Sequence, residues 1–139
     1  MAMNKYLPII TLNVSGLNAP IKRHRIAEWI RNDDPYICCL QEIRLRIKDL
    51  HRLKVKGWKK NIASKRKGKK AGVAILISDK IDFKKKKKAI KRDPEGHFII
   101  LKGRNHQEDI NTINIYAPNI GAFSLCISIQ IHKENLGGL

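Results

Sequence analysis

Short apolar runs separated by polar or turn-forming residues divide the chain, and most of them have the length of a β-strand. The runs at residues 9–14, 36–41 and 71–78 are continuous, which is typical of strands that are buried on both faces. Trp58 and Ile62 indicate a further short strand. The pattern therefore predicts a sheet built mainly from central strands.

A second pattern predicts a hairpin near the end of the chain. Residues 97–102 and 110–116 are apolar enough for strands, and a polar stretch at 103–109 joins them. Successive side chains of a strand point to opposite faces. In the second strand this predicts an apolar face with Ile113 and Ile115, and a polar face with Asn114 and Tyr116.

One helix is predicted between the first two strands. Asn18-Ala19-Pro20 is typical of a helix start, because the missing N–H of proline costs nothing in the first turn. Asp33-Asp34-Pro35 predicts its end. A strand, a helix and a strand in about 35 residues form a typical crossover unit with parallel strands. Together with the hairpin, this unit predicts an α/β domain with a mixed sheet.

The charge of the chain changes the picture, because it is large and unevenly distributed. The formal net charge is +17, and 21 of the 29 Lys and Arg residues lie between Arg44 and Arg92, against three acids. Such a block must face water or a polyanion, and nucleic acid is favoured over an anionic membrane surface. Residues 64–70 and 84–88 are expected to be exposed loops, with these nucleic-acid-binding candidates: Lys65, Arg66, Lys67, Lys69 and Lys70.

Cysteine usage and hydropathy indicate the cellular compartment of the protein. Cys38 and Cys39 are adjacent within an apolar run, and with Cys126 they have neither zinc-site spacing nor the pattern of a disulfide framework. We therefore expect reduced thiols, no membrane-spanning segment, and a location in the nucleus or cytoplasm.

Three polar residues lie at predicted strand ends, where a core does not require them. They are Asn13, Glu42 and Tyr116. If these ends cluster, the set suits metal-assisted phosphodiester chemistry, because a carboxylate binds Mg²⁺, an amide orients it, and a tyrosine hydroxyl donates to a developing oxyanion. Taken singly, each residue is as well explained as a cap, a solvated side chain or a packing residue.

The order of several short motifs is more specific than any one of them. They are Leu12-Asn13-Val14-Ser15-Gly16-Leu17-Asn18, Ile21-Lys22-Arg23-His24-Arg25, Leu40-Gln41-Glu42, Lys56-Gly57-Trp58, Lys70-Ala71-Gly72-Val73-Ala74-Ile75-Leu76, Lys91-Arg92-Asp93-Pro94-Glu95-Gly96-His97 and Asn114-Ile115-Tyr116-Ala117-Pro118-Asn119. From about residue 9 to 122 this series resembles the N-terminal half of the endonuclease domain of long-interspersed-element (non-LTR) retrotransposons. That domain belongs to the endonuclease/exonuclease/phosphatase superfamily, together with apurinic/apyrimidinic endonucleases.

The resemblance implies a fold, an activity and a set of roles. The fold is a deoxyribonuclease-I-like four-layered α/β sandwich, which we expect to be partial in this chain, and the activity is Mg²⁺-dependent nicking of DNA. By the same resemblance Asn13, Tyr116 and Asn119 are catalytic, with Asn119 in the same motif as Tyr116, and Glu42 binds the metal.

The sequence also departs from the pattern of that family. Where the family has Thr-His-Leu after Gln-Glu, this chain has Ile43-Arg44-Leu45. The later Gly-Asp-Phe-Asn and Ser-Asp-His motifs, whose aspartate and histidine activate water, do not occur. We therefore divide the chain into a truncated domain at 1–122 and a divergent, strand-like tail at 123–139. We also expect the partner sheet to be largely missing, which would leave apolar faces for association.

Three hypotheses follow from these patterns. The chain is a catalytically impaired remnant of a Mg²⁺-dependent DNA endonuclease, or a basic nucleic-acid-binding fragment without catalysis, or a product without a stable fold.

Overall fold

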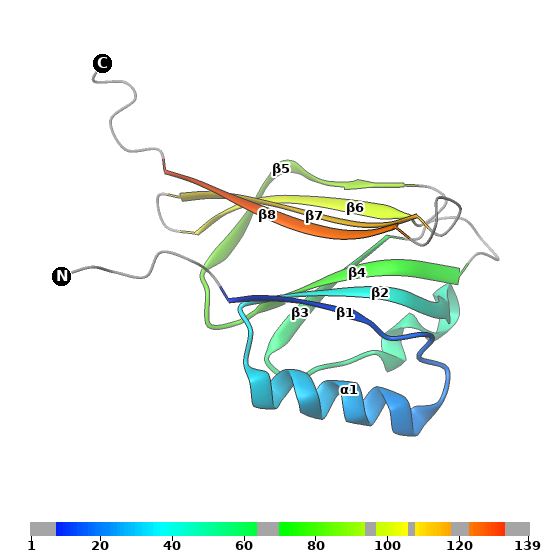
Figure 1. Cartoon of the computed structure of the whole chain (residues 1–139). Coiled ribbons are helices and arrows are strands. Elements are labelled where there is room, and N and C mark those ends of the chain that lie inside the picture. Colours follow the sequence, from blue (N-terminus) through cyan, green and yellow to red (C-terminus); the bar gives the residue numbers. More distant parts are fainter. Residues whose placement is uncertain (1–7, 64–69, 94–96, 106–107, 118–122, 133–139) are drawn as a thin grey trace, which may run out of the picture.

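The computed structural model describes residues 8–63, 70–93, 97–105, 108–117 and 123–132, which form one helix, one short 3-10 helix and two stacked four-stranded sheets (Figure 1). The first sheet has the order β1 (Ile9–Asn13), β2 (Ile37–Arg46), β4 (Lys70–Ser78), β3 (Trp58–Ala63). The second has the order β5 (Phe83–Arg92), β6 (Phe98–Asn105), β7 (Glu108–Ala117), β8 (Phe123–His132). The predicted mixed α/β fold is confirmed.

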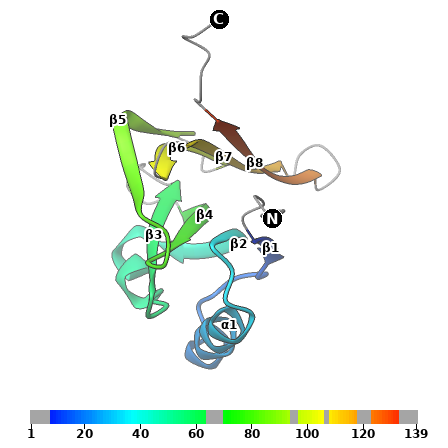
Figure 2. The ribbon, with the colours of Figure 1, turned by 90° about the vertical axis from the view of Figure 1, so that its left-hand side faces the viewer.

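The first crossover unit forms as its local sequence predicts. Helix α1 (Pro20–Asp33) joins β1 and β2, which pair in parallel. The helix ends at Asp34, whose left-handed backbone (φ 55°) lets its N–H donate to the Ile30 carbonyl at 2.8 Å. Figure 2 shows α1 end-on beneath the first sheet, with the second sheet on the opposite side.

Two apolar cores hold these layers together. Between α1 and the first sheet lie buried residues that include Leu17, Ile30, Cys38, Leu40 and Leu45. Alternate residues of the same strands point the other way, toward the second sheet. This second core includes Ile37, Cys39, Ile75, Leu101 and Ile110.

The short 3-10 helix η1 (Ile47–Arg52) follows β2, and a lysine from β3 donates hydrogen bonds to carbonyls at its C-terminal end. Lys60 Nζ, from β3, donates to the carbonyls of Leu50 and Leu53. Burial lowers the pKa of Lys60 from its ordinary value. Lys60 therefore supports the local fold, although its charge belongs to the basic block.

Two of our expectations about the second sheet are wrong. The partner sheet is not largely missing, because β5–β8 form a four-stranded second sheet. The run at 84–88 is not a loop but lies within β5, which pairs with β6 on either side of an irregular stretch between Lys85 and Ile90. Pairing uses backbone groups that every lysine has, and lysine is a common residue on sheet edges.

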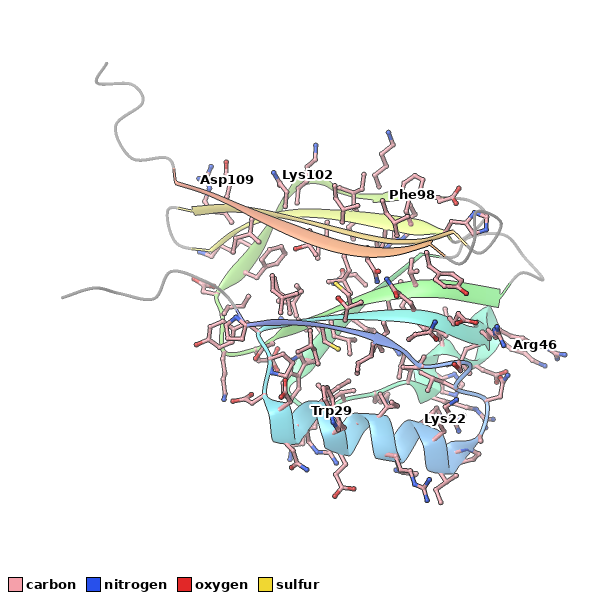
Figure 3. The ribbon with its side chains drawn as sticks, in the orientation of Figure 1. Lys22, Trp29, Arg46, Phe98, Lys102 and Asp109 are labelled. Carbon is pink, nitrogen blue, oxygen red and sulfur yellow. The ribbon has the colours of Figure 1, made fainter. Side chains whose placement is uncertain are left out.

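The hairpin and its two faces agree with the sequence pattern. Strands β6 and β7 pair antiparallel, with Asn114 buried and Tyr116 packed on the second core. On the outer face Phe98 pairs with Ile115 and projects away from the molecule (Figure 3). No helix covers this face in the part of the chain that the structure describes. Association through this face stays a prediction.

The part of the tail that the structure describes, residues 123–132, is a strand, as expected. Strand β8 pairs with β7 from Glu108 and His132 at one end to Ala117 and Phe123 at the other. Whether 123–139 forms a unit separate from 1–122 is untested.

The cysteines differ from the expectation of reduced thiols. Cys38 is a free thiol, and burial raises its pKa to about 12, which makes it a poor nucleophile. Cys39, however, is disulfide-bonded.

Gly103 makes a close contact that predicts the effect of a substitution. A Cβ atom at this position would lie 2.1 Å from Cζ of the Phe83 ring. Gly103→Ala is therefore expected to displace the ring and lower the free energy of unfolding by about 2 kcal/mol, measured by urea denaturation. In a Phe83→Ala background the same change should cost much less. Equal costs in both backgrounds would show that the ring is not the obstacle.

Candidate active site

The structure brings together three of the polar strand ends that the sequence indicates. Asn13 ends β1, Glu42 lies on β2 and Tyr116 lies near the end of β7. The Asn13 amide nitrogen donates to Glu42 Oε2, and the Tyr116 hydroxyl donates to the same carboxylate. Residues far apart in the sequence thus converge on one carboxylate, while their chemical roles stay predictions.

A bulge in β2 presents Glu42. Gln41 pairs with Val73 and Leu45 pairs with Ala71, so three residues of β2 lie opposite one residue of β4. Within the bulge Glu42 has φ 55° and Arg44 has φ 56°. Positive φ is uncommon for residues other than glycine, and it marks positions that the surrounding structure over-determines.

The loop that follows β1 holds the bulge in place. The backbone N–H groups of Gly16 and Leu17 donate to the carbonyls of Glu42 and Ile43 at 2.7 and 2.9 Å. Ile43 is fully buried, which anchors the middle of the bulge in the first core. Glu42 is therefore carried on a fixed backbone rather than on a free strand end.

The same loop orients Asn13. Its Oδ1 atom accepts hydrogen bonds from the backbone N–H of Ser15 at 3.0 Å and from Ser15 Oγ at 3.3 Å. With the carbonyl side of the amide turned toward Ser15, the Nδ2 group is directed at Glu42. This is an Asx-type turn used to aim a side chain.

A buried polar network positions β7 over the first sheet. Asn114 Nδ2 donates to the carbonyls of Leu40 and Ala74 at 3.1 and 2.9 Å, and its Oδ1 accepts from Gln41 Nε2 at 3.1 Å. Asn114 is fully buried and lies two residues before Tyr116. Our sequence reasoning placed Asn114 on the polar face but gave it no role. The available signal was an asparagine between two isoleucines of one strand, which places its side chain on the face opposite to theirs.

Arg44 is the second residue that sequence reasoning missed. Its guanidinium Nη2 forms an ion pair with Glu42 Oε1. The sequence marked Ile43-Arg44-Leu45 only as a departure from the related family. Residues two apart approach each other here because of the bulge.

These contacts set the charge state of the site. The hydrogen bond from Asn13, aided by the Arg44 charge and by Tyr116, lowers the pKa of Glu42 despite an opposing effect of desolvation. Desolvation and the neighbouring Glu42 charge raise the pKa of Tyr116. At neutral pH the site therefore holds an ionised carboxylate and a protonated phenol that can donate a hydrogen bond.

The lowered pKa of Glu42 gives a testable pH dependence. A carboxyl group with a depressed folded-state pKa adds stability above its ordinary pKa of 4.5, and this stability is lost as the pH falls through the folded-state value. Glu42→Gln should therefore reduce the difference in urea midpoint between pH 7 and pH 3, while Glu28→Gln on the exposed surface of α1 should leave it unchanged. An unaltered difference in Glu42→Gln would contradict the assignment.

The divalent metal that the resemblance implies can be tested against the donor set. Glu42 is the carboxylate of this cluster, and its oxygens accept from Arg44 and Asn13. The Asn13 carbonyl oxygen accepts from Ser15. Among the described residues there is no group of three or more His, Cys, Asp and Glu side chains that could hold a metal ion. As arranged here, these residues do not fit a Mg²⁺ site, which needs free oxygen ligands in octahedral geometry.

The other predicted site residues do not belong to this cluster in the part of the chain that the structure describes. Asn119 and the cations at 65–69 lie outside the described residues. Lys70 is the first residue of β4 and pairs with Arg46 of β2, at the same end of the strand pair as the bulge. Figure 3 shows Arg46 pointing away from the domain at this end.

The fold is an α/β sandwich in which a helix covers one of two stacked sheets, and comparison with known proteins gives the family. Residues 10–124 match the Endonuclease/Exonuclease/phosphatase family. The chain therefore belongs to this family.

Several solved structures are similar to this chain, and the one with a TM-score above 0.5 supports the fold. An AP endonuclease, LMAP from Leishmania major, has 16% sequence identity and a TM-score of 0.51, over 88% of this chain and 39% of that one. TDP2 from C. elegans has 17% identity and a TM-score of 0.48, over 89% of this chain and 35% of that one. D. rerio TDP2, complexed with single strand DNA product, has 14% identity and a TM-score of 0.48, over 96% and 49%. This chain thus spans less than half the length of these proteins.

Among the described residues, no helix is long and apolar enough to cross a membrane.

Proposed function

We propose that this chain carries one half of an endonuclease-type phosphodiesterase site, binds the nucleic-acid backbone, and turns over phosphodiesters poorly by itself. The observation that carries the proposal is the convergence of Asn13 and Tyr116 on the Glu42 carboxylate at one end of the stacked sheets. Membership of the Endonuclease/Exonuclease/phosphatase family supports the same chemistry.

The finer reading is a remnant of a Mg²⁺-dependent DNA endonuclease of the retrotransposon type. The ordered motifs from Leu12 to Asn119 support that origin. Impaired catalysis follows from the donor set, because this cluster supplies one carboxylate that is already bonded on both oxygens. The nucleus or the cytoplasm, where such a protein would meet nucleic acid, remains our proposed location.

A second candidate function is nucleic-acid binding without catalysis. It is favoured by the 21 Lys and Arg residues between Arg44 and Arg92, against three acids. A block of this density attracts polyanions regardless of any chemistry at Glu42. Both candidates share DNA binding, so nicking separates them.

Incubation with supercoiled plasmid and Mg²⁺ tests the proposal. We expect nicking by the wild-type chain to be no faster than by Glu42→Gln, because both oxygens of the Glu42 carboxylate are already bonded to Asn13 and Arg44. Slow nicking that disappears in Glu42→Gln, but persists in a Glu28→Gln control, would favour the endonuclease remnant with residual turnover. Robust nicking by the wild type would contradict the proposed impairment.

A further inference from the structure

The carboxylate of Glu42 already has a cation. Arg44 Nη2 pairs with Oε1, the Asn13 amide donates to Oε2, and the side chain of Glu42 is only 13% exposed. A metal ion binding this carboxylate would therefore have to displace a guanidinium group, an amide group or both. The arrangement satisfies the carboxylate without any ion from solvent.

Arg44 is held in this position by its surroundings. Its backbone lies in the bulge at φ 56°, and its carbonyl accepts a hydrogen bond from Asn18 Nδ2 at 3.4 Å. Its aliphatic stem passes over Gly16, where a Cβ atom would lie 3.7 Å from Arg44 Cδ. A fixed stem leads the guanidinium back to Glu42, two residues earlier, so the ion pair is part of the local fold.

The space beside this ion pair favours anions. A pocket of about 400 Å³ is lined by Ser15, Gly16, Asn18, Ala19, Lys22 and Arg44. Its charged lining residues are both cations, and Lys22 Nζ is held close by a 3.0 Å hydrogen bond to the Ser15 carbonyl. A divalent cation approaching Glu42 from this side meets like charges. A guanidinium has five N–H donors, so Arg44 keeps donors for an oxyanion such as a backbone phosphate.

We propose that Arg44 is a built-in counter-cation that excludes divalent metal ions from Glu42, so that this chain meets a nucleic-acid phosphate with a guanidinium where related enzymes would use a metal. The inference rests on the proposed function in that it concerns the same carboxylate. It makes Arg44 a specificity-determining residue for the cation at the site.

Mn²⁺ titration followed by electron paramagnetic resonance tests this directly and needs no nucleic acid. Arg44→Gln should bind Mn²⁺ at least about tenfold more tightly than the wild type, because one positive charge leaves the carboxylate. Arg46→Gln is the matched control, since it removes another exposed arginine from the same strand, and it should leave the affinity for Mn²⁺ unchanged. The double variant Glu42→Gln/Arg44→Gln should lose the gain.

Several outcomes would overturn the inference. One is a wild-type affinity for Mn²⁺ equal to that of Arg44→Gln. Another is an increase in Mn²⁺ affinity in Arg46→Gln as large as that in Arg44→Gln. A third is an increase in Mn²⁺ affinity that persists in the double variant. Arg44→Lys gives a second arm if Arg44→Gln folds poorly, because it retains the charge and should still exclude Mn²⁺. Tight Mn²⁺ binding by Arg44→Lys would show that charge is not the cause.

A thermal melt supplies an independent readout. Mg²⁺ should raise the Tm of Arg44→Gln and leave the wild-type Tm unchanged, because only a ligand that binds the folded state stabilises it. An equal rise in both proteins would overturn the inference. A wild-type chain that binds no DNA would contradict the proposed function, while the metal titrations would still decide the role of Arg44.

Discussion

Replacing Asn114 by alanine is expected to lower the free energy of unfolding by about 3 kcal/mol, the largest effect that we predict for a single polar residue. The side chain makes three hydrogen bonds at 2.9–3.1 Å, to the carbonyls of Leu40 and Ala74 and from the amide of Gln41. All of these groups lie between the two sheets, where water does not replace a lost partner. Urea denaturation measures the change.

Asn111 provides the matched control for Asn114. It is an asparagine on the same strand, but its Oδ1 atom is buried with no hydrogen-bond partner among the described residues. Asn111→Ala should therefore change the free energy of unfolding by less than about 1 kcal/mol. Equal losses in the two variants would show that the polar contacts between the sheets contribute little.

The network also predicts an effect on the site. Tyr116 lies two residues beyond Asn114 on the same face of β7, so loosening β7 should move its hydroxyl away from Glu42. The Glu42 charge helps to raise the Tyr116 pKa. In Asn114→Ala, ultraviolet titration of the phenol should show a pKa closer to the ordinary value of 10.0. An unchanged pKa would separate the stability role of Asn114 from any role at the site.

Raising the salt concentration from about 50 to about 200 mM should weaken DNA binding by about 10³-fold, if the basic block contacts six or more phosphates. Residues 44–92 contain 21 cationic side chains and three acids. Each DNA phosphate that these cations neutralise releases condensed counterions, so the affinity falls as the salt concentration rises. Fluorescence anisotropy of a labelled oligonucleotide measures the affinity at each salt concentration.

Two single-charge variants show where the phosphates lie. Lys70→Gln changes a residue at the end of the first sheet where β2 is bulged. Lys102→Gln changes an exposed residue on the outer face of the second sheet (Figure 3). The log–log salt slope should fall by about 0.9 for Lys70→Gln and stay the same for Lys102→Gln. Equal log–log salt slopes in both variants would contradict DNA binding near the candidate site. Salt-independent affinity would contradict the electrostatic model as a whole.

Much of the fold could be predicted from local sequence. The helix begins at Pro20 and ends at Asp34 because proline suits a first turn and an aspartate tolerates the left-handed cap. The apolar run at 71–78 formed β4, because a strand of that composition is stable only between two covered faces. The lysine run at 84–88 was wrongly predicted to be a loop, because polar side chains do not prevent the backbone of β5 from pairing with β6.

The candidate site was predictable only in part. The positions of Asn13, Glu42 and Tyr116 at strand ends are visible in the sequence, because strand ends follow from where apolar runs stop. Their meeting depends on the register of β1 with β2 and on the stacking of β7 over the first sheet. Such non-local geometry has no signature in a short stretch of sequence.

The sequence by itself determined most of the elements of this protein, the basic block and the carboxylate at Glu42, because these follow from residue type and local periodicity. Only the tertiary structure decided which partners that carboxylate has. The bulge in β2 turned Arg44 back onto Glu42, and Asn114 crossed between the sheets to hold β7 in place. Both arrangements depend on backbone hydrogen bonds between segments distant in the chain, which fix positions that side-chain preferences leave open.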